Sequence, residues 1–274
     1  MDVHGPYTAP QAHYDALAGS SAAAPVHRLS EDHYQRIPPY LRMPAWARQQ
    51  ESREVAVWRQ RYAAGVRWMD ASVGTLFAAL RERGLLDAAL VIVTSDHGEA
   101  LYEHRGWDHG YTAYEHQIHV PLVLRFPGGA HGGRRVGDVV GLVDVMPTLL
   151  AVAGAELPPG VQGRDLTPVL SGQKGSDVMF TEAIKWRPGQ RVVRTAEHKL
   201  IIDRNTDELT LYDLQADPAE SRDVATEDPE TVDRLRAQLV AHEAANAAHG
   251  GLSGRAAEVP ADVAERLRAL GYLE

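Results

Sequence analysis

The sequence predicts an α/β protein in which helices sandwich a parallel-rich sheet, with a small C-terminal subdomain built on an antiparallel sheet. Three observations predict it. A long helical pattern precedes two short apolar runs, a second helical pattern follows them, and short strand patterns alternate with turn residues after about Gly172. A chain of 274 residues can form one large domain and a smaller appendage. We therefore predict a division into residues 1–172 and 173–274.

In the first part, the periodicity of apolar residues is weak up to about residue 50 and strong after it. Residues 1–10 are expected to form a strand end and a Pro/Gly turn, and residues 11–50 loops with short helical pieces. Between residues 51 and 83, apolar side chains recur every three or four positions, and Gly84 follows where a C-cap would lie. This spacing predicts one long amphipathic helix.

Two short apolar runs predict the strands of the main sheet. The run "LVIVTS" at residues 90–95 is continuous, which is typical of a strand buried on both faces of a parallel sheet. The second run, "VPLVLRF", covers residues 120–126, and "LVDVMPTLLAVAG" at residues 142–154 predicts a helix that ends at Gly154. The order helix, strand, loop, strand, helix is that of a layered α/β fold.

The C-terminal part has a different pattern. Short β-rich segments are separated by turn residues, which predicts a small antiparallel sheet. A helix near residues 229–245 and a terminal helix, "ADVAERLRALGY", are expected to follow it. The four strand candidates are "VMFTEAIKW", "QRVVRTA", "HKLIID" and "ELTLYDL".

Composition excludes several classes of protein. The net charge of −9 argues against a nucleic-acid partner, because the phosphate backbone attracts clustered Lys and Arg. The chain has no cysteine, and therefore no disulfide, thiolate metal site or cysteine nucleophile. No apolar run approaches the roughly 18 residues that indicate a membrane span. The N-terminus, "MDVHGPYTAP", has no signal-peptide apolar region, and the sequence assigns no localisation.

Acidic residues and histidines gather directly after the first predicted strand, in "VIVTSDHGEALYEHRGWDHG" at residues 91–110. Active groups of open parallel sheets lie beyond the carboxyl ends of the strands. Asp96 and His97 occupy this position, and Gly98 allows a close approach of the backbone. A carboxylate beside an imidazole can form half of a metal site, or the imidazole can donate to an anionic group.

Structural explanations of the same residues stay open on the pattern alone. The Asp96–His97 pair could be a helix cap or turn, and Glu99 and Glu103, four residues apart, could belong to a solvated helix face. His4 could fix the Gly5-Pro6 bend. Three further histidines are expected to lie on the surface or to support the site without touching substrate: His104, His116 and His119.

Several longer motifs resemble the sulfatase family of the alkaline-phosphatase superfamily. They are "DVHGPYTAP", "TSDHGE", "EHRGWDHGYTAYE", "HVPLVLRFPG", "LVDVMPTLLAVAG", "GRDLTPVLSG", "LYDLQADPAES" and "RLRALGYLE". They cover the chain in the order that the family has. The resemblance implies the family's α/β sandwich with a small C-terminal subdomain, and metal-dependent hydrolysis of a sulfuric ester.

The resemblance also assigns roles to four residues. Asp96 and His97 match metal ligands of the family. Calcium is the expected ion, and manganese is an alternative because His97 is a nitrogen ligand. His109, in "DHG", matches a Lys or His that contacts the ester and aids the leaving group, so we expect it to be the general acid. His4 matches a histidine that binds the sulfate oxygens. The implied chemistry is attack on sulfur by a metal-activated hydroxyl.

The sequence departs from the family at the nucleophile. Sulfatases use a formylglycine made from Cys or Ser in a C/S-x-P-x-R motif, and this chain has neither a cysteine nor a Ser-x-Pro-x-Arg segment. The paired aspartates that complete the family's metal site are also absent. In the family "DVHGPY" lies well inside the chain, so we expect this sequence to be a C-terminal portion. The isolated chain is expected to be inactive and to need an upstream half as its partner.

Three interpretations therefore remain. The chain could be the C-terminal part of a sulfatase, the same part of a phosphodiester or phosphonate monoester hydrolase, or a non-catalytic remnant. His97 mildly favours the second, because many sulfatases have Asn at that position. No Gly-rich phosphate loop or G-x-S-x-G segment suggests another class of enzyme.

Overall fold

The computed structural model describes residues 7–17, 55–183, 189–248 and 263. Met1–Arg236 and Ala237–Glu274 form two compact units. His4 and the predicted terminal helix lie outside the described residues, apart from Val263. Among the residues described, no helix has the length and apolar character needed to span a membrane.

The N-terminal helices confirm the strongest helical pattern of the sequence. The short helix α1 covers Gln11–Asp15, and the long helix α4 covers Val55–Glu82. Gly84 has a φ of +67°, the left-handed conformation that glycine adopts after a helix end. Trp58, near the start of α4, is 1% exposed and belongs to an apolar cluster with Tyr7 and Trp107. This cluster joins the start of α4 to the loop that carries the candidate site.

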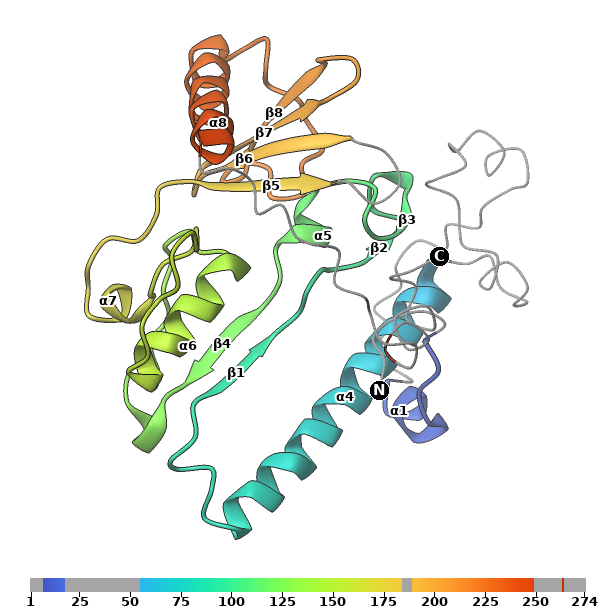
Figure 1. Cartoon of the computed structure of the whole chain (residues 1–274). Coiled ribbons are helices and arrows are strands. Elements are labelled where there is room, and N and C mark those ends of the chain that lie inside the picture. Colours follow the sequence, from blue (N-terminus) through green and yellow to red (C-terminus); the bar gives the residue numbers. More distant parts are fainter. Residues whose placement is uncertain (1–6, 18–54, 184–188, 249–262, 264–274) are drawn as a thin grey trace. The chain divides into compact units, whose positions relative to one another are not determined.

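The two strands of the main sheet are antiparallel, so the expected parallel pairing is wrong for the described residues. Strand β1 covers Val91–Thr94 and β4 covers Leu122–Arg125, and they lie side by side (Figure 1). The register pairs Thr94, the last residue of β1, with Leu122, the first of β4. The connection returns to the end of the pair from which it left, which makes the strands antiparallel. The residues of β1 are half-buried or exposed, not buried on both faces.

The connection between β1 and β4 contains four short elements. The two-residue strands β2, Ala100–Leu101, and β3, Trp107–Asp108, form an antiparallel hairpin, and the 3₁₀ turn η2, Glu103–Arg105, lies in the loop between them. Helix α5, Glu115–Ile118, follows. The residues of this connection therefore lie beyond the end of the β1–β4 pair where β1 ends and β4 begins. This is the end at which the sequence predicts the site.

The segment after β4 contains the second predicted helix. α6 ends at Gly154, whose φ is +68°, as the sequence predicts. The Asp144 side chain is buried and accepts hydrogen bonds from the backbone N–H groups of Gly141 and Arg164, both at 3.0 Å. These bonds stabilise the start of the helix. The elements are η3 (Pro127–Gly129), η4 (Leu142–Asp144), α6 (Val145–Ala153) and α7 (Thr167–Leu170).

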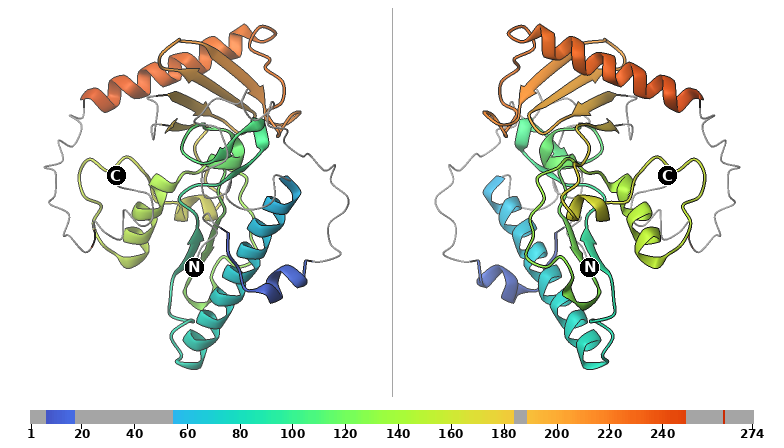
Figure 2. Two further views of the ribbon diagram at one scale, coloured as in Figure 1. Left: turned by 90° about the vertical axis from the view of Figure 1, so that its right-hand side faces the viewer. Right: turned by 90° about the vertical axis from the view of Figure 1, so that its left-hand side faces the viewer.

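All four strand candidates of the C-terminal part form strands. They make one antiparallel sheet in the order β5-β6-β7-β8, and the strands lie side by side in both views of Figure 2. The central strand β7 is the most buried, since four of its six residues are buried. The predicted helix near residues 229–245 is α8, Pro229–Ala248. The strands are β5 (Met179–Ala183), β6 (Gln190–Arg194), β7 (His198–Asp203) and β8 (Leu209–Asp213).

Candidate active site

The structure brings together three of the four residues that the sequence singles out. The imidazole rings of His97 and His109 are stacked, with centroids 3.7 Å apart and planes inclined by 20°. His97 Nε2 lies 3.8 Å from Asp96 Oδ2. Thus the end of β1 and the end of the β2–β3 hairpin meet, although 11 residues separate His97 from His109 in Gly98–Asp108.

His109 is buried among carboxylates. Its side chain is 5% exposed, and its Nδ1 lies 3.0 Å from Asp108 Oδ1 and 3.3 Å from Glu99 Oε1. The second oxygen of Glu99 accepts a hydrogen bond of 2.6 Å from the Tyr7 hydroxyl. We call Tyr7, Glu99, Asp108 and His109 the His109 cluster.

The charges of the His109 cluster keep the imidazole protonated. Burial alone would lower the pKa of His109, but hydrogen bonds to Asp108 and Glu99 and the negative charges of both residues raise the pKa to about 9. Burial and the charge of Glu99 raise the pKa of Tyr7, which keeps its hydroxyl a donor. At neutral pH the cluster therefore presents an imidazolium, which can bind an anion and can donate a proton.

The backbone around the His109 cluster is locally strained. Four non-glycine residues between positions 102 and 108 have positive φ angles: Tyr102 (81°), His104 (47°), Arg105 (61°) and Asp108 (70°). Such conformations cost energy and gather at functional sites. The last of the four residues, Asp108, is the one whose carboxylate lies 3.0 Å from the neighbouring imidazole.

Asp96 and His97 fit a divalent metal ion as two of its ligands. Both residues would hold such an ion, since a carboxylate and an imidazole are ligand types that divalent ions accept and the two side chains lie 3.8 Å apart. The Nδ1 atom of His97 lies 2.8 Å from the Gly98 carbonyl oxygen, which fixes the tautomer with its lone pair on Nε2. The Asp96 side chain is 65% exposed and so open to an ion from solvent.

A second group of possible ligands lies beside this pair. Atoms of Glu99, Asp108 and His109 lie within 4.8 Å of one another. Nδ1 of His109 faces both carboxylates, an arrangement that forms hydrogen bonds when the nitrogen carries a proton and could hold a metal ion when the proton is displaced. Asp96 and His97 remain the ligands that the sequence predicts.

Helix α5 holds the two segments that carry the histidines. The N–H of Gly98 donates to the carbonyl oxygen of Gln117 at 2.7 Å, and the N–H of Glu99 donates to that of His116 at 3.0 Å. The Gln117 side chain is buried, and its Oε1 accepts from the N–H of Gly110 at 3.1 Å. One residue of α5 therefore contacts the neighbours of both His97 and His109.

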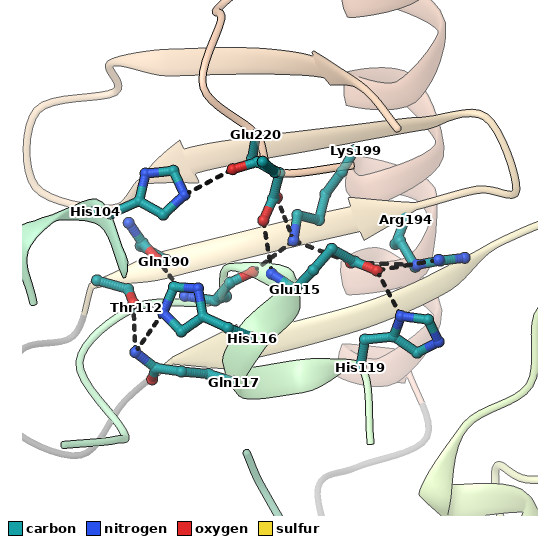
Figure 3. Close-up of polar contacts among 12 residues, drawn as sticks. His104, Thr112, Glu115, His116, Gln117, His119, Gln190, Arg194, Lys199 and Glu220 are labelled. Atoms are coloured by element: carbon teal, nitrogen blue, oxygen red, sulfur yellow. Dashed lines mark hydrogen bonds and ion pairs between the residues drawn. The ribbon is translucent and has the colours of Figure 1, made fainter. Parts of the chain in front are cut away.

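Of the other three histidines that the sequence singles out, His104 and His116 share one environment, with ring centroids 5.7 Å apart, and His119 has another. His104 stacks on Tyr114, with ring centroids 3.7 Å apart, and the exposed His119 pairs with Glu115 at 3.1 Å. Burial lowers the pKa of His116 to about 4, so its ring is neutral at physiological pH. His104 and His116 line a cavity of about 200 Å³ next to α5, together with Tyr111, Thr112 and Gln190 among others. Figure 3 shows the side chains of His104, Thr112, His116, His119 and Gln190.

Sequence reasoning missed the role of Glu99. The spacing of Glu99 and Glu103 suggested a solvated helix face, but this stretch is a hairpin and the Glu99 side chain is only 6% exposed. Glu103 does not join the His109 cluster; its Oε1 lies 2.8 Å from Arg59 Nη2. Asp108 adjoins His109 in the sequence and could have been identified from that position. Tyr7 is distant in sequence and had no local signal.

Comparison with known proteins places the chain in a family. The sulfatase family model matches residues 1–155, and the model of the C-terminal region of N-sulphoglucosamine sulphohydrolase matches residues 102–245. The first match covers more than half of the chain. The chain belongs to the sulfatase family, which confirms the resemblance found in its motifs. Sulfatases generally use a divalent metal ion.

The curated relatives extend well beyond this chain. Mouse arylsulfatase K is 34% identical over 183 residues, which are 62% of this chain and 33% of the relative. An N-acetylglucosamine-6-O-sulfatase of Bacteroides thetaiotaomicron is 32% identical over 191 residues, which are 66% of this chain and 33% of the relative. The chain thus spans about a third of the length of these relatives.

Solved structures show the same fold. One structure, bound to its substrate D-glucosamine-2-N,6-O-disulfate, has a TM-score of 0.64 at 22% identity and covers 90% of this chain and 63% of its own. A phosphonate monoester hydrolase from Silicibacter pomeroyi has a TM-score of 0.62 at 29% identity, covering 70% and 42%. These neighbours establish an alkaline-phosphatase-like fold.

Proposed function

We propose that this chain supplies the leaving-group side of a site that hydrolyses sulfuric esters. The observation that carries the proposal is the buried, protonated imidazole of His109, held by Glu99 and Asp108 and stacked on His97. Membership of the sulfatase family supports the substrate class. We also propose that residues 1–172 belong to the catalytic domain and residues 173–274 to the C-terminal subdomain.

In the proposed reaction, His109 has two tasks. Its positive charge binds the anionic ester, and it then donates a proton to the alcohol oxygen as the bond between sulfur and that oxygen breaks. Glu99 and Asp108 stabilise the imidazolium and fix its orientation at Nδ1. Asp96 and His97 would hold a divalent ion, calcium or manganese, which when bound supplies positive charge next to the transferring group.

The nucleophile is proposed to come from a polypeptide segment that this chain does not contain. Neither a cysteine nor a Ser-x-Pro-x-Arg segment is present to become formylglycine. The fraction of the relatives that the chain covers, about a third, supports the same proposal. His4 is proposed to bind sulfate oxygens, as the family motif implies.

A phosphonate monoester hydrolase is the second candidate function. Two solved structures of this activity are similar to the chain, at 29% identity (TM-score 0.62) and 27% identity (TM-score 0.56). These identities exceed that of the complex with the disulfated sugar, at 22%, and lie below that of mouse arylsulfatase K, at 34%. Sulfuric esters and phosphonate monoesters are both anionic, and an imidazolium can bind either. The two candidate functions are therefore distinguished by measuring hydrolysis of each substrate.

The first test measures metal binding by the chain itself. Calcium and manganese are titrated while the melting temperature is recorded, for the wild type, a D96A/H97A double variant and an H119A control with an exposed histidine. We expect a rise in melting temperature in the wild type and the control that the double variant loses. Equal responses in all three would exclude these ligands.

The second test measures hydrolysis after a polypeptide with the Cys/Ser-x-Pro-x-Arg motif is added to complete the site. Aryl sulfate and aryl phosphonate substrates are compared, with H109A beside the wild type. Loss of general acid catalysis by a single group costs about 10²–10⁴-fold in rate. Faster turnover of the phosphonate would select the second candidate, and a complemented but inactive chain would favour a non-catalytic remnant.

A further inference from the structure

The C-terminal sheet contains a lysine whose charge is completely buried. Lys199 lies on β7 and is 0% exposed. Its Nζ donates to the carbonyl oxygen of Ala113 at 2.9 Å and lies 3.1 Å from Glu115 Oε1 and 2.5 Å from Glu220 Oε1. Two hydrogen bonds, to Ala113 and Glu115, and one ion pair with Glu220 thus surround the ammonium group. Figure 3 shows the side chains that meet there.

The partners of Lys199 fix the start of helix α5. Glu220 Oε2 accepts a hydrogen bond of 2.6 Å from the N–H of Glu115, the first residue of α5. Burial would raise the pKa of Glu115, but hydrogen bonds and the charges of Arg194 and Lys199 outweigh burial and lower it. The carboxylate is therefore ionised, and α5 is attached to the sheet by charge-assisted bonds (Figure 3).

Helix α5 in turn fixes the backbone of the candidate site. Gln117 accepts from the N–H of Gly98 and, through its side chain, from the N–H of Gly110. These two residues follow His97 and His109 directly. Lys199 is therefore connected to both histidines through Glu115 and Gln117.

The buried charges around Lys199 suggest a role in fixing the position of α5, beyond a contribution to the stability of the fold. Burying an ion pair costs desolvation energy, and apolar side chains of the same volume often stabilise a fold as well or better. What a buried ammonium group with two hydrogen bonds and an ion pair supplies is a defined geometry, because its partners must lie in fixed directions. The element that this geometry fixes is α5.

We propose that Lys199 is a positioning residue of the candidate site, which acts through α5 and Gln117 on the backbone that carries His97 and His109. This role rests on the proposed function, because His109 needs a fixed position only if it acts on an ester. The effect of Lys199 on the backbone at His97 and His109 does not depend on hydrolysis. It can therefore be tested on the chain alone.

The test compares K199M with the wild type by amide hydrogen exchange and by NMR. K174M is the matched control, because Lys174 is 76% exposed and pairs with Asp177. We expect the amides of Gly98, Glu99 and Gly110 to exchange at least about tenfold faster in K199M, while the β1–β4 amides keep their rates. The Cε1–H resonances of His97 and His109 should shift in K199M and stay in place in K174M.

Two outcomes would overturn the proposal. Unchanged exchange at the three amides would show that α5 holds without Lys199. Equal acceleration at all amides would show a loss of overall stability alone. If K199M does not fold, K199M/E220Q removes the lysine together with one carboxylate charge and is measured in its place.

A further variant tests the route through Gln117. Q117A removes the side-chain acceptor of the Gly110 amide, so in Q117A the K199M change should add little to the exchange rate of that amide. Additive effects would refute this route. If the exchange results hold but no ester is hydrolysed after complementation, the positioning role stands and the proposed function fails.

Discussion

Glu99 shows how one buried carboxylate can determine the chemistry of a neighbouring histidine. Its two oxygens have different partners: Oε1 lies 3.3 Å from His109 Nδ1, and Oε2 accepts from the Tyr7 hydroxyl at 2.6 Å. The tyrosine thus holds the carboxylate in place. The carboxylate, with Asp108, stabilises the positive charge of the imidazole.

The exchange of Glu99 for glutamine should lower the pKa of His109. The amide keeps the size of the side chain but removes one of two negative charges, so we expect a fall from about 9 by about one unit or more. The measurement is an NMR titration of the His109 Cε1–H resonance. E103Q is the control, because Glu103 contacts Arg59 and not His109.

The same change has a consequence for stability. A histidine whose pKa is raised on folding stabilises the protein at pH values below about 6.5, and this contribution is lost as pH rises through about 9. Between these values the free energy of unfolding should fall less with pH in E99Q than in the wild type. An identical slope in urea unfolding, or an unchanged His109 pKa, would contradict the assignment.

At the scale of elements, the contact between α5 and the segment after β1 depends on a glycine. A Cβ atom on Gly98 would lie 2.1 Å from the backbone oxygen of His116, far inside van der Waals contact. We expect G98A to destabilise the protein by about 1–3 kcal/mol, because backbone has to move to make room. Urea unfolding measures this difference.

Helix α4 offers a glycine that should respond in the opposite direction. Nothing lies within 4 Å of a Cβ built on Gly74, and a helical Gly→Ala exchange stabilises by roughly 0.5–1 kcal/mol. Opposite signs for G98A and G74A would separate the close approach from a general effect of alanine. Destabilisation by both variants, or by neither, would refute the explanation from space.

The elements differ in how well the sequence predicts them, for a physical reason. Helix α4, the end of α6 at Gly154 and the strands β5–β8 follow from local periodicity and turn residues, and the structure confirms them. The direction of β4 against β1 depends on where the chain between them goes, and local patterns do not encode that path. Asp96, His97 and His109 were predicted because they lie in local motifs. The burial of Glu99 and its contact with Tyr7 were missed because they depend on segments that are distant in the sequence.

At the scale of the whole molecule, β1 and β4 form a sheet with open edges. Within the described residues each of these strands has a single partner strand, and Val123 on β4 is 58% exposed. Unpaired strand edges with apolar side chains favour association with other chains. An additional segment that completes the site would, in the proposed function, also cover this sheet.

We therefore expect the isolated chain to associate with itself in a concentration-dependent way, and V123K to weaken this association. A lysine on an edge strand opposes pairing, because a second strand would bury or repel its charge. Sedimentation velocity over a range of concentrations measures the effect, with L76K as the control, since Leu76 on α4 is 55% exposed but lies on no sheet edge. An equal decrease in both variants would assign the association to general apolar exposure, and a monomeric wild type would show that this sheet is stable without a partner.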